Sequence, residues 1–478
     1  MTTIYFWTIL TYLLALLLVG FRGSRDVRSQ EDFSVAGRRL NTFVLSGTLL
    51  ATWIGTGSIF GNAEKTYRVG LAALMLPCAS LLGIGLLYFL AGRARALQQI
   101  TIQDLLETRY NAAARVFGVL TLVIAYTTIV SYQYRAGGVV LNLAMPSLPV
   151  PTAVLVIAGF IILFTATAGM ISIAYIGAVQ GVTMAVGITL ALGVFWSRVD
   201  GVQGMQRILE PSHFEVLGPI GPLEALGLLL PTFLLVLGDA NMYQRFFSAR
   251  SAGVARKAVL WTLGGVAFME SIIILTAWVA TALEPDLEIH GRIIAYAARD
   301  HLPPLLGAVV LTAIMAIILS TAGSYLLAPA TALVRDVYQR FVEPQASEAR
   351  LVFLLRVFVI ALGVIAYYLS TLSEEFLAVA LLAYTIYGAG ITPALLAAFC
   401  WRRATGFGAV ASIASGTAVT LFWEAYGSPA VDAVVPAIIA SVAALVVCSL
   451  LTPAPPKEKV KPFFRKPGED PHPSRVHQ

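Results

Sequence analysis

The sequence is poor in charge, cysteine and histidine. Only 12% of its 478 residues are charged, whereas a soluble domain carries roughly a quarter. Because 58% of the residues are hydrophobic, a chain of this length has too few charges to cover a water-exposed surface. The three cysteines, Cys78, Cys400 and Cys448, lie in apolar runs without metal-ligand spacing, so we interpret them as small core residues.

The placement of histidine bears on the class of function. All five histidines fall in predicted loops or in the C-terminal tail, and no His/acid cluster occurs within an apolar run. An integral membrane enzyme needs titratable groups gathered at its site. We therefore predict that the protein is not an enzyme.

Apolar runs of about 20 residues recur from end to end, which is the length that crosses a bilayer as a helix. They do not alternate as the strands of a membrane barrel do. Because a helix satisfies its own backbone groups in lipid, we predict an all-α polytopic membrane protein. The thirteen predicted spans are residues 3–21, 41–66, 71–92, 114–144, 150–168, 172–197, 221–246, 257–283, 303–334, 352–371, 376–400, 405–425 and 430–452.

Basic residues are unevenly distributed between the loops of this topology. If the N-terminus lies outside, the cytoplasmic segments hold 24 of them and the opposite side holds 6. This asymmetry predicts an outside N-terminus and a cytoplasmic C-terminus in a bacterial inner membrane. It also explains the net charge of +6 without nucleic acid, so the expected partners are the lipid bilayer and a small solute. We expect a monomer to be functional.

Two spans carry features that break helices at membrane depth. The second contains three glycines and three hydroxyls within Leu49–Gly61, and the seventh ends with an acid and an amide within Leu237–Arg245. Breaks at corresponding positions of two halves are typical of inverted-repeat transporters, although a glycine-rich helix contact is the alternative at the first break. The predicted organisation is residues 1–40 (extra helix and loop), 41–197 (first repeat), 198–220 (extracellular loop), 221–400 (second repeat), 401–452 (two extra helices) and 453–478 (disordered tail).

The ninth span places Ser320, Thr321 and Ser324 within about one helical turn. Hard cations prefer oxygen ligands, so hydroxyls on an intact helix and carbonyls from an unwound one form a neutral cage suited to sodium. The alternative is that these hydroxyls bond back to their own helix.

Several motifs, in this order, resemble the sodium:solute symporter family, which includes bacterial proline, galactose and sialic-acid symporters and the animal choline transporter. They are Ser34-Val35-Ala36-Gly37-Arg38-Arg39, Ala51-Thr52-Trp53-Ile54-Gly55, Gly61-Asn62-Ala63-Glu64 (most like the choline branch), Gln244-Arg245, Ser320-Thr321, Leu333-Val334-Arg335-Asp336-Val337-Tyr338, Ile391-Thr392-Pro393-Ala394 and Trp401-Arg402-Arg403.

The resemblance implies a LeuT-type fold whose ten-helix core, spans two to eleven, consists of two inverted five-helix repeats. It also implies a Na⁺ site between the first and eighth core helices. Carried over by position, its ligands are the carbonyls of Ala51, Ile54 and Ile317 and the hydroxyls of Ser320 and Thr321.

The sequence departs from the family at three positions. Gly177 stands where some members have an aspartate for a second sodium, and Gly323 replaces a serine of that site. We therefore predict one sodium per cycle. Trp53 stands where the proline-type members have an acid, which argues against a proline-type pocket.

In such a fold the solute binds beside the broken helices. The candidate substrate residues are Trp53, Thr56, Gly57, Gln133, Asp239, Asn241, Tyr243, Tyr384 and Tyr387. Asp239 is an intramembrane acid suited to a cationic or quaternary-ammonium solute, or else it is a structural partner of Arg245. Arg135 either favours an anionic or zwitterionic solute or extends to the interface.

These features together predict a sodium-coupled symporter that imports a small organic solute by alternating access. Proton coupling in the same fold and a non-transporting membrane sensor remain the alternatives, and the identity of the solute stays open. A sensor usually carries a soluble signalling domain, for which residues 453–478 are too few.

Overall fold

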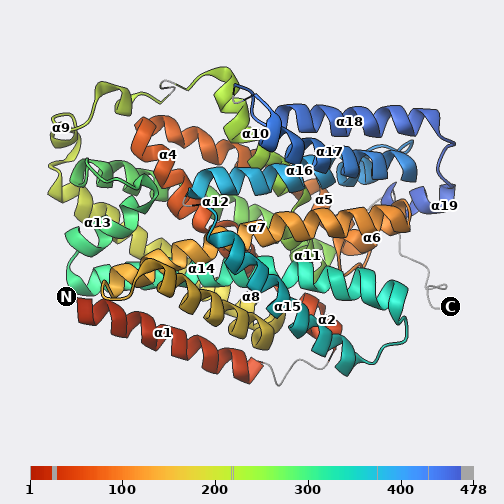
Figure 1. Ribbon diagram of the computed structural model, residues 1–478, viewed down its shortest axis with the longest axis horizontal. Helices are drawn as coiled ribbons and strands as arrows, with labels where there is room; N and C mark the ends of the chain where they lie inside the picture. The colour runs from red at the N-terminus through yellow and green to blue at the C-terminus, as the bar shows by residue number, and fades with distance from the viewer. Residues whose placement is uncertain are drawn as a thin grey trace.

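The computed structural model describes residues 2–23, 29–216, 218, 220–373, 375–428 and 430–464. Its helices run along the long axis of the molecule as a single bundle (Figure 1). Their bounds are α1 (Thr2–Gly23), α2 (Gln30–Val35), α3 (Thr42–Trp53), α4 (Asn62–Val69), α5 (Leu76–Ala96), α6 (Ile102–Arg109), α7 (Ala112–Ala144), α8 (Val150–Arg198), α9 (Gly201–Met205), α10 (Pro222–Gly238), α11 (Ala240–Ser248), α12 (Ala252–Leu283), α13 (Ile293–His301), α14 (Pro304–Ala332), α15 (Glu348–Ser370), α16 (Phe376–Cys400), α17 (Gly406–Tyr426), α18 (Val434–Leu451) and α19 (Lys457–Val460).

Eleven helices of the described chain are long and apolar enough to cross a membrane, and two shorter apolar helices, Ile4–Leu18 and Thr42–Trp53, accompany them. Polar side chains begin several of these helices. Asn111 accepts a hydrogen bond from the backbone N–H of Ala114 at the start of α7, and Ser251 accepts one from Val254 at the start of α12. Such caps satisfy backbone donors that the first helical turn leaves free. The polypeptide is therefore a multi-pass helical membrane protein, as predicted.

α8 is helical over 49 residues, where the sequence predicted two spans. Straight, it would be roughly 74 Å long, more than twice the ~30 Å hydrocarbon core. Two separate membrane-length apolar segments lie within it, Val150–Thr167 and Val179–Arg198, in agreement with the two predicted spans.

α14 lies in the middle of the bundle, whereas α1 and α18 lie on opposite edges of it (Figure 1). The apolar segment of α14 is 83% buried, against 28% for that of α18. A helix enclosed on all sides presents every face to a neighbour, so its hydroxyls necessarily meet protein rather than lipid. This placement makes α14 the central scaffold of the fold.

Both predicted helix breaks are confirmed. α3 ends because Ile54 is extended (φ −73°, ψ 101°), and a π-helical turn, Gly57–Gly61, leads into α4. α10 ends at Asp239 (φ −59°, ψ 116°), whose carboxylate then accepts a hydrogen bond from the N–H of Met242 and begins α11. Ile54 and Asp239 are each 1% exposed, and non-helical backbone is tolerated at membrane depth where protein encloses it.

The predicted disorder of the tail is wrong for its first part. α19 and the 3₁₀ turn Lys461–Phe464 follow α18, and the ring of Phe463 is buried, 5.6 Å from that of Phe399. An aromatic side chain that reaches an apolar pocket offsets the entropy of ordering a short segment. Residues 465–478 of the predicted tail lie outside the described residues.

Candidate functional site

The break in α3 faces the hydroxyl-bearing stretch of α14. The Oγ1 atom of Thr321 donates to the carbonyl oxygen of Ala51 at 3.1 Å and lies 3.5 Å from that of Ile54. Ser320 Oγ lies 3.4 Å from the carbonyl oxygen of Ile317. These five residues are each at most 4% exposed. The structure thus brings Thr321 to the carbonyls of Ala51 and Ile54, about 270 residues away in sequence. The hydroxyls of Ser320 and Ser324 instead bond back to their own helix, which was the alternative for this stretch.

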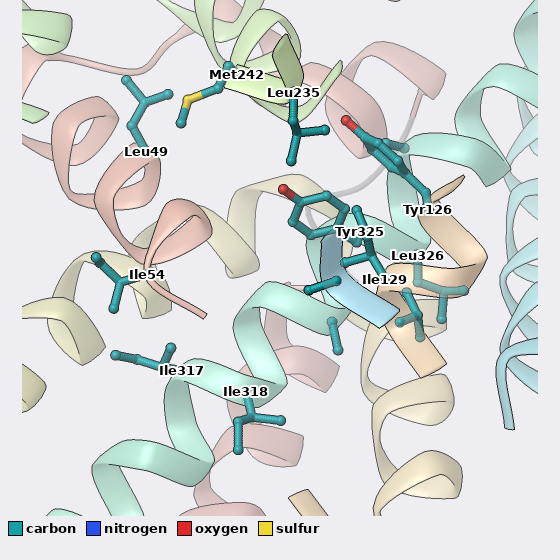
Figure 2. Close-up of a cluster of buried hydrophobic side chains, with 14 of the residues drawn as sticks. Leu49, Ile54, Tyr126, Ile129, Leu235, Met242, Ile317, Ile318, Tyr325 and Leu326 are labelled. Atoms are coloured by element: carbon teal, nitrogen blue, oxygen red, sulfur yellow. The ribbon is translucent and has the colours of Figure 1, made fainter. Parts of the chain in front are cut away.

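The carbonyls at this break are available because the helix ends there. The last described bond of α3 runs from the N–H of Ile54 to the carbonyl of Leu50, so the carbonyls after Leu50 belong to a terminus without a following turn. The side chains of Ile54 and Ile317 flank this place in the apolar cluster of Figure 2. We use the term oxygen cage for five neutral oxygens at this place: the carbonyls of Ala51, Ile54 and Ile317 and the hydroxyls of Ser320 and Thr321. Such a set within an apolar shell contains no acid and fits a small hard cation.

Close packing holds the broken segment against α14 and α7. A Cβ atom on Gly55 would lie 2.9 Å from Thr321 Cγ2 and 3.2 Å from Gln133 Nε2. Gln133 Oε1 accepts a short hydrogen bond from the hydroxyl of Thr56 and a 3.4 Å bond from its N–H. Both side chains were predicted to contact substrate, and in this structure they bond to each other and fix the break.

A cavity of about 40 Å³ opens beside the break and is lined partly by Trp53, Gly57 and Tyr384, three of the predicted substrate residues. The hydroxyls of Tyr384 and Tyr132 lie 3.2 Å apart, and a Cβ atom on Gly57 would come within 2.7 Å of Tyr384 Oη. The absence of a side chain at Gly57 is therefore what lets the tyrosine close over the break.

Asp239 does not line this cavity. Its carboxylate accepts hydrogen bonds from the hydroxyls of Tyr126 and Tyr325, both at 3.0 Å, besides the 2.8 Å bond from the N–H of Met242. The rings of Tyr126 and Tyr387 are 5.1 Å apart. Asp239 is therefore a satisfied helix cap inside a tyrosine cluster, seen in part in Figure 2.

The other predicted residues near the second break, Asn241 and Tyr243, are also not among the residues that line the cavity. Asn241 is fully buried, and its carbonyl accepts a hydrogen bond from Arg245. The hydroxyl of Tyr243 donates to the carbonyl of Leu237 at 3.3 Å, and its ring packs edge-on against that of Phe246. The second break thus contributes packing and backbone satisfaction, not a lining to the cavity.

Arg245 occupies a buried position beside the oxygen cage. Its guanidinium donates to Thr48 Oγ1 on α3 (3.2 Å), to the carbonyl of Asn241 (3.2 Å) and to Ser324 Oγ on α14 (2.8 Å). Thr48 precedes the cage residues of α3 by about one turn, and Ser324 follows those of α14 by about one turn. The guanidinium consequently links the two helices that form the cage, a role the sequence did not reveal.

Glu270 on α12 is the carboxylate that does line the cavity, and the sequence analysis did not select it. It is 3% exposed and accepts hydrogen bonds from Ser58 and Asn62. A signal was available, because Glu270 is the only acid between residues 257 and 283, and an acid at membrane depth indicates function.

A broken helix that presents carbonyls to an intact, hydroxyl-bearing helix inside a membrane bundle is typical of ion-coupled secondary transporters. The comparison with protein families is specific on this point: the model of the sodium:solute symporter family matches residues 33–416, and the chain belongs to that family. It is a sodium-coupled solute symporter, with Na⁺ as the coupling ion, and not an enzyme.

Curated relatives match over nearly the whole chain. The high-affinity proline transporter PutP of Bacillus subtilis is 25% identical, covering 92% of this chain and 96% of its own length. The osmoregulated proline transporter OpuE of the same organism is 24% identical (95% and 96% covered), and the sodium/proline symporter of Escherichia coli is 23% identical (95% of each chain).

Solved structures agree on the fold. An outward-open Na⁺-coupled sialic acid symporter superposes with a TM-score of 0.81 at 16% identity, covering 94% of this chain and 98% of that one. The nucleobase-cation symporter Mhp1 superposes with a TM-score of 0.60 at 11% identity, covering 91% and 99%. At these identities the likeness shows the LeuT-type fold that the sequence predicted.

Proposed function

We propose that the coupling ion binds to the carbonyl oxygens of Ala51, Ile54 and Ile317 and the hydroxyls of Ser320 and Thr321. The observation that carries this proposal is the approach of Thr321 Oγ1 to the carbonyls of Ala51 and Ile54, at 3.1 and 3.5 Å. Rotation of the hydroxyl hydrogen away from Ala51 turns an oxygen lone pair toward the ion.

One such ion drives each cycle. The position of a second, acid-containing site is taken by close helix packing: a Cβ atom on Gly177 would lie 3.2 Å from Ala51 Cβ, and one on Gly323 would lie 3.1 Å from Thr165 Oγ1. An aspartate at Gly177 would therefore require Ala51 on α3 to give way by a few tenths of an ångström. These contacts support a stoichiometry of one.

Sodium favours the conformation in which α3 and α14 are held together at the cage. Because the ion contacts both helices only in that arrangement, its binding energy shifts the equilibrium toward it. Release of the ion allows one repeat, residues 41–197, to move against the other, residues 221–400. The transporter thereby imports a small organic solute with the ion; its relatives named as proline transporters support a solute of amino-acid size.

The orientation follows from the basic loops. α1 begins at the end of the bundle where α9 and α13 lie, and α6 and α19 lie at the opposite end (Figure 1). With the N-terminus outside a bacterial inner membrane, the positively charged segments are cytoplasmic. A monomer suffices, because the cage and the cavity are formed by one chain. Reporter domains fused to the C-terminus, active only inside or only outside the cell, test this orientation.

The coupling test uses the purified protein in liposomes and in detergent. Binding of ²²Na⁺ to the wild type is expected to be saturable, and Thr321→Ala is expected to weaken it at least tenfold, whereas Thr312→Ala on the same helix leaves it unchanged. Wild-type sodium binding that survives in Thr321→Ala contradicts the site. Uptake that a proton gradient drives equally well without sodium contradicts the coupling ion.

A further inference from the structure

The cavity beside the broken helix contains a single carboxylate. Glu270 is the only acidic residue among the described residues that line it, and none of those residues is Lys, Arg or His. The lining also includes the aromatic rings of Trp53 and Tyr384 and the polar side chains of Ser58 and Asn62. The cavity therefore combines a single carboxyl group with two aromatic side chains in its lining.

Both hydrogen-bond partners of Glu270 among the described residues are neutral. Ser58 Oγ donates to one carboxylate oxygen and Asn62 Nδ2 donates to the other, each at 2.7 Å. Neutral donors solvate an ionised carboxylate only in part, and a buried charge without a counter-charge is costly. Each carboxylate oxygen retains acceptor capacity toward the cavity. The site is consequently suited to a cation that arrives from solution.

Asp239, the acid that the sequence offered for this role, is differently placed. Three hydrogen-bond donors already surround its carboxylate, two of them tyrosine hydroxyls, and it lies outside the cavity's lining. Glu270 thus replaces Asp239 as the acid that a solute can reach.

We infer that Glu270 receives a positively charged group of the transported solute, a protonated amine or a quaternary ammonium, with Trp53 and Tyr384 providing aromatic faces beside it. This inference rests on the proposed function. The volume of about 40 Å³ admits a few water molecules, so in this conformation the cavity fits a cationic head group rather than a whole solute.

The placement also connects the solute to the moving part of the protein. Ser58 and Asn62 belong to the π-helical turn and to α4, on the far side of the break from α3. A cation at Glu270 draws negative charge from the carboxylate and so weakens the two hydrogen bonds that Ser58 and Asn62 donate to it. Loading of the solute therefore changes how the outer half of the broken helix is attached to α12.

The experiment measures binding of small probes to the full-length purified protein by thermal shift and calorimetry, in sodium and in potassium. The probes are choline, glycine betaine and proline, together with 3,3-dimethyl-1-butanol, the uncharged shape-mate of choline. At least one cationic or zwitterionic probe is expected to bind in sodium, and the uncharged alcohol is expected to bind at least tenfold more weakly than choline if choline is that probe.

Glu270→Gln is expected to lower the affinity for the bound probe at least tenfold, while the affinity for ²²Na⁺ stays within twofold of that of the wild type. Glu270→Asp retains the charge and is expected to lose less affinity. The matched control is Glu64→Gln, which removes a carboxylate of the ion pair with Arg68 outside the cavity lining. Retained ²²Na⁺ binding shows that each variant is folded.

Three results overturn the inference. The first is unchanged probe affinity in Glu270→Gln, and the second is a wild type that none of the charged probes stabilises. The third is loss of a second sodium from Glu270→Gln with solute affinity retained, which makes Glu270 an ion site instead. A failure of the proposed function gives a different result. Binding of the probe to the wild type would then be the same in sodium and in potassium, whatever residue stands at position 270.

Discussion

Thr321 Oγ1 lies 3.1 Å from the carbonyl oxygen of Ala51, which joins the intact α14 to the last turn of the broken α3. This contact depends on a close approach of the two backbones. Gly55 makes the approach possible, because any Cβ atom there would lie 2.9 Å from Thr321 Cγ2.

Gly55→Ala is therefore expected to raise the sodium concentration for half-maximal uptake at least tenfold, equivalent to about 1.4 kcal/mol. Thr321→Ser removes the clashing methyl group and keeps the hydroxyl, so the double variant Gly55→Ala/Thr321→Ser is expected to recover part of the loss. Sodium titrations of uptake measure both effects. A double variant worse than the sum of the single variants would show that the methyl group is not the obstacle.

Gly57 bears on the solute instead of the ion. Its Cβ position lies 2.7 Å from Tyr384 Oη, so Gly57→Ala is expected to displace the tyrosine from the cavity and raise the KM for solute severalfold with little change in sodium dependence. Tyr384→Phe removes the obstructing oxygen and is expected to restore room for the alanine. Equal effects on solute and sodium would instead indicate a general disturbance of the break.

The close packing at Gly177 leads to a prediction of one sodium ion per transport cycle. Uptake by the wild type is expected to depend on sodium with a Hill coefficient of one. Gly177→Asp is expected to impair transport without raising that coefficient, because its Cβ atom would lie 3.2 Å from Ala51 Cβ. A coefficient near two in the wild type contradicts the single site, and a gain of a second ion in the variant contradicts the packing argument.

The tyrosine cluster around Asp239 predicts a stability effect. Tyr126→Phe and Tyr325→Phe each remove one donor to the same carboxylate oxygen, and each is expected to cost about 0.5–2 kcal/mol, the range for polar contacts within membranes. The double variant is expected to lose more than the sum, since that oxygen then keeps neither hydroxyl donor. Thermal unfolding in detergent measures these losses, and additive or negligible effects argue against a shared carboxylate.

At position 245 we predict that a positive charge alone does not maintain the link between α3 and α14. Arg245→Lys keeps the positive charge but lacks the planar fork that reaches Thr48, the Asn241 carbonyl and Ser324 together. We expect uptake to fall at least tenfold and thermal stability to decrease. Arg250→Lys, at an exposed position after α11, is the matched control. Wild-type uptake in Arg245→Lys would show that the link between α3 and α14 is dispensable.

The sequence by itself determined the membrane class, the positions of both helix breaks and the hydroxyl stretch of α14. These features are local: the length of an apolar run, glycines beside hydroxyls, and residues one turn apart all act over a few positions. The motifs added the family, and the match over residues 33–416 confirmed it.

Only the tertiary structure decided which buried acid faces the cavity. Asp239 and Glu270 look alike in sequence, each an acid at the depth of a predicted span. Their partners lie far away along the chain, since Tyr126 is 113 residues from Asp239 and Ser58 is 212 residues from Glu270. Helical periodicity gives the face on which a side chain lies, but the element that packs against that face is set by how all the helices assemble. That assembly surrounds Asp239 with tyrosine hydroxyls and leaves Glu270 beside the break.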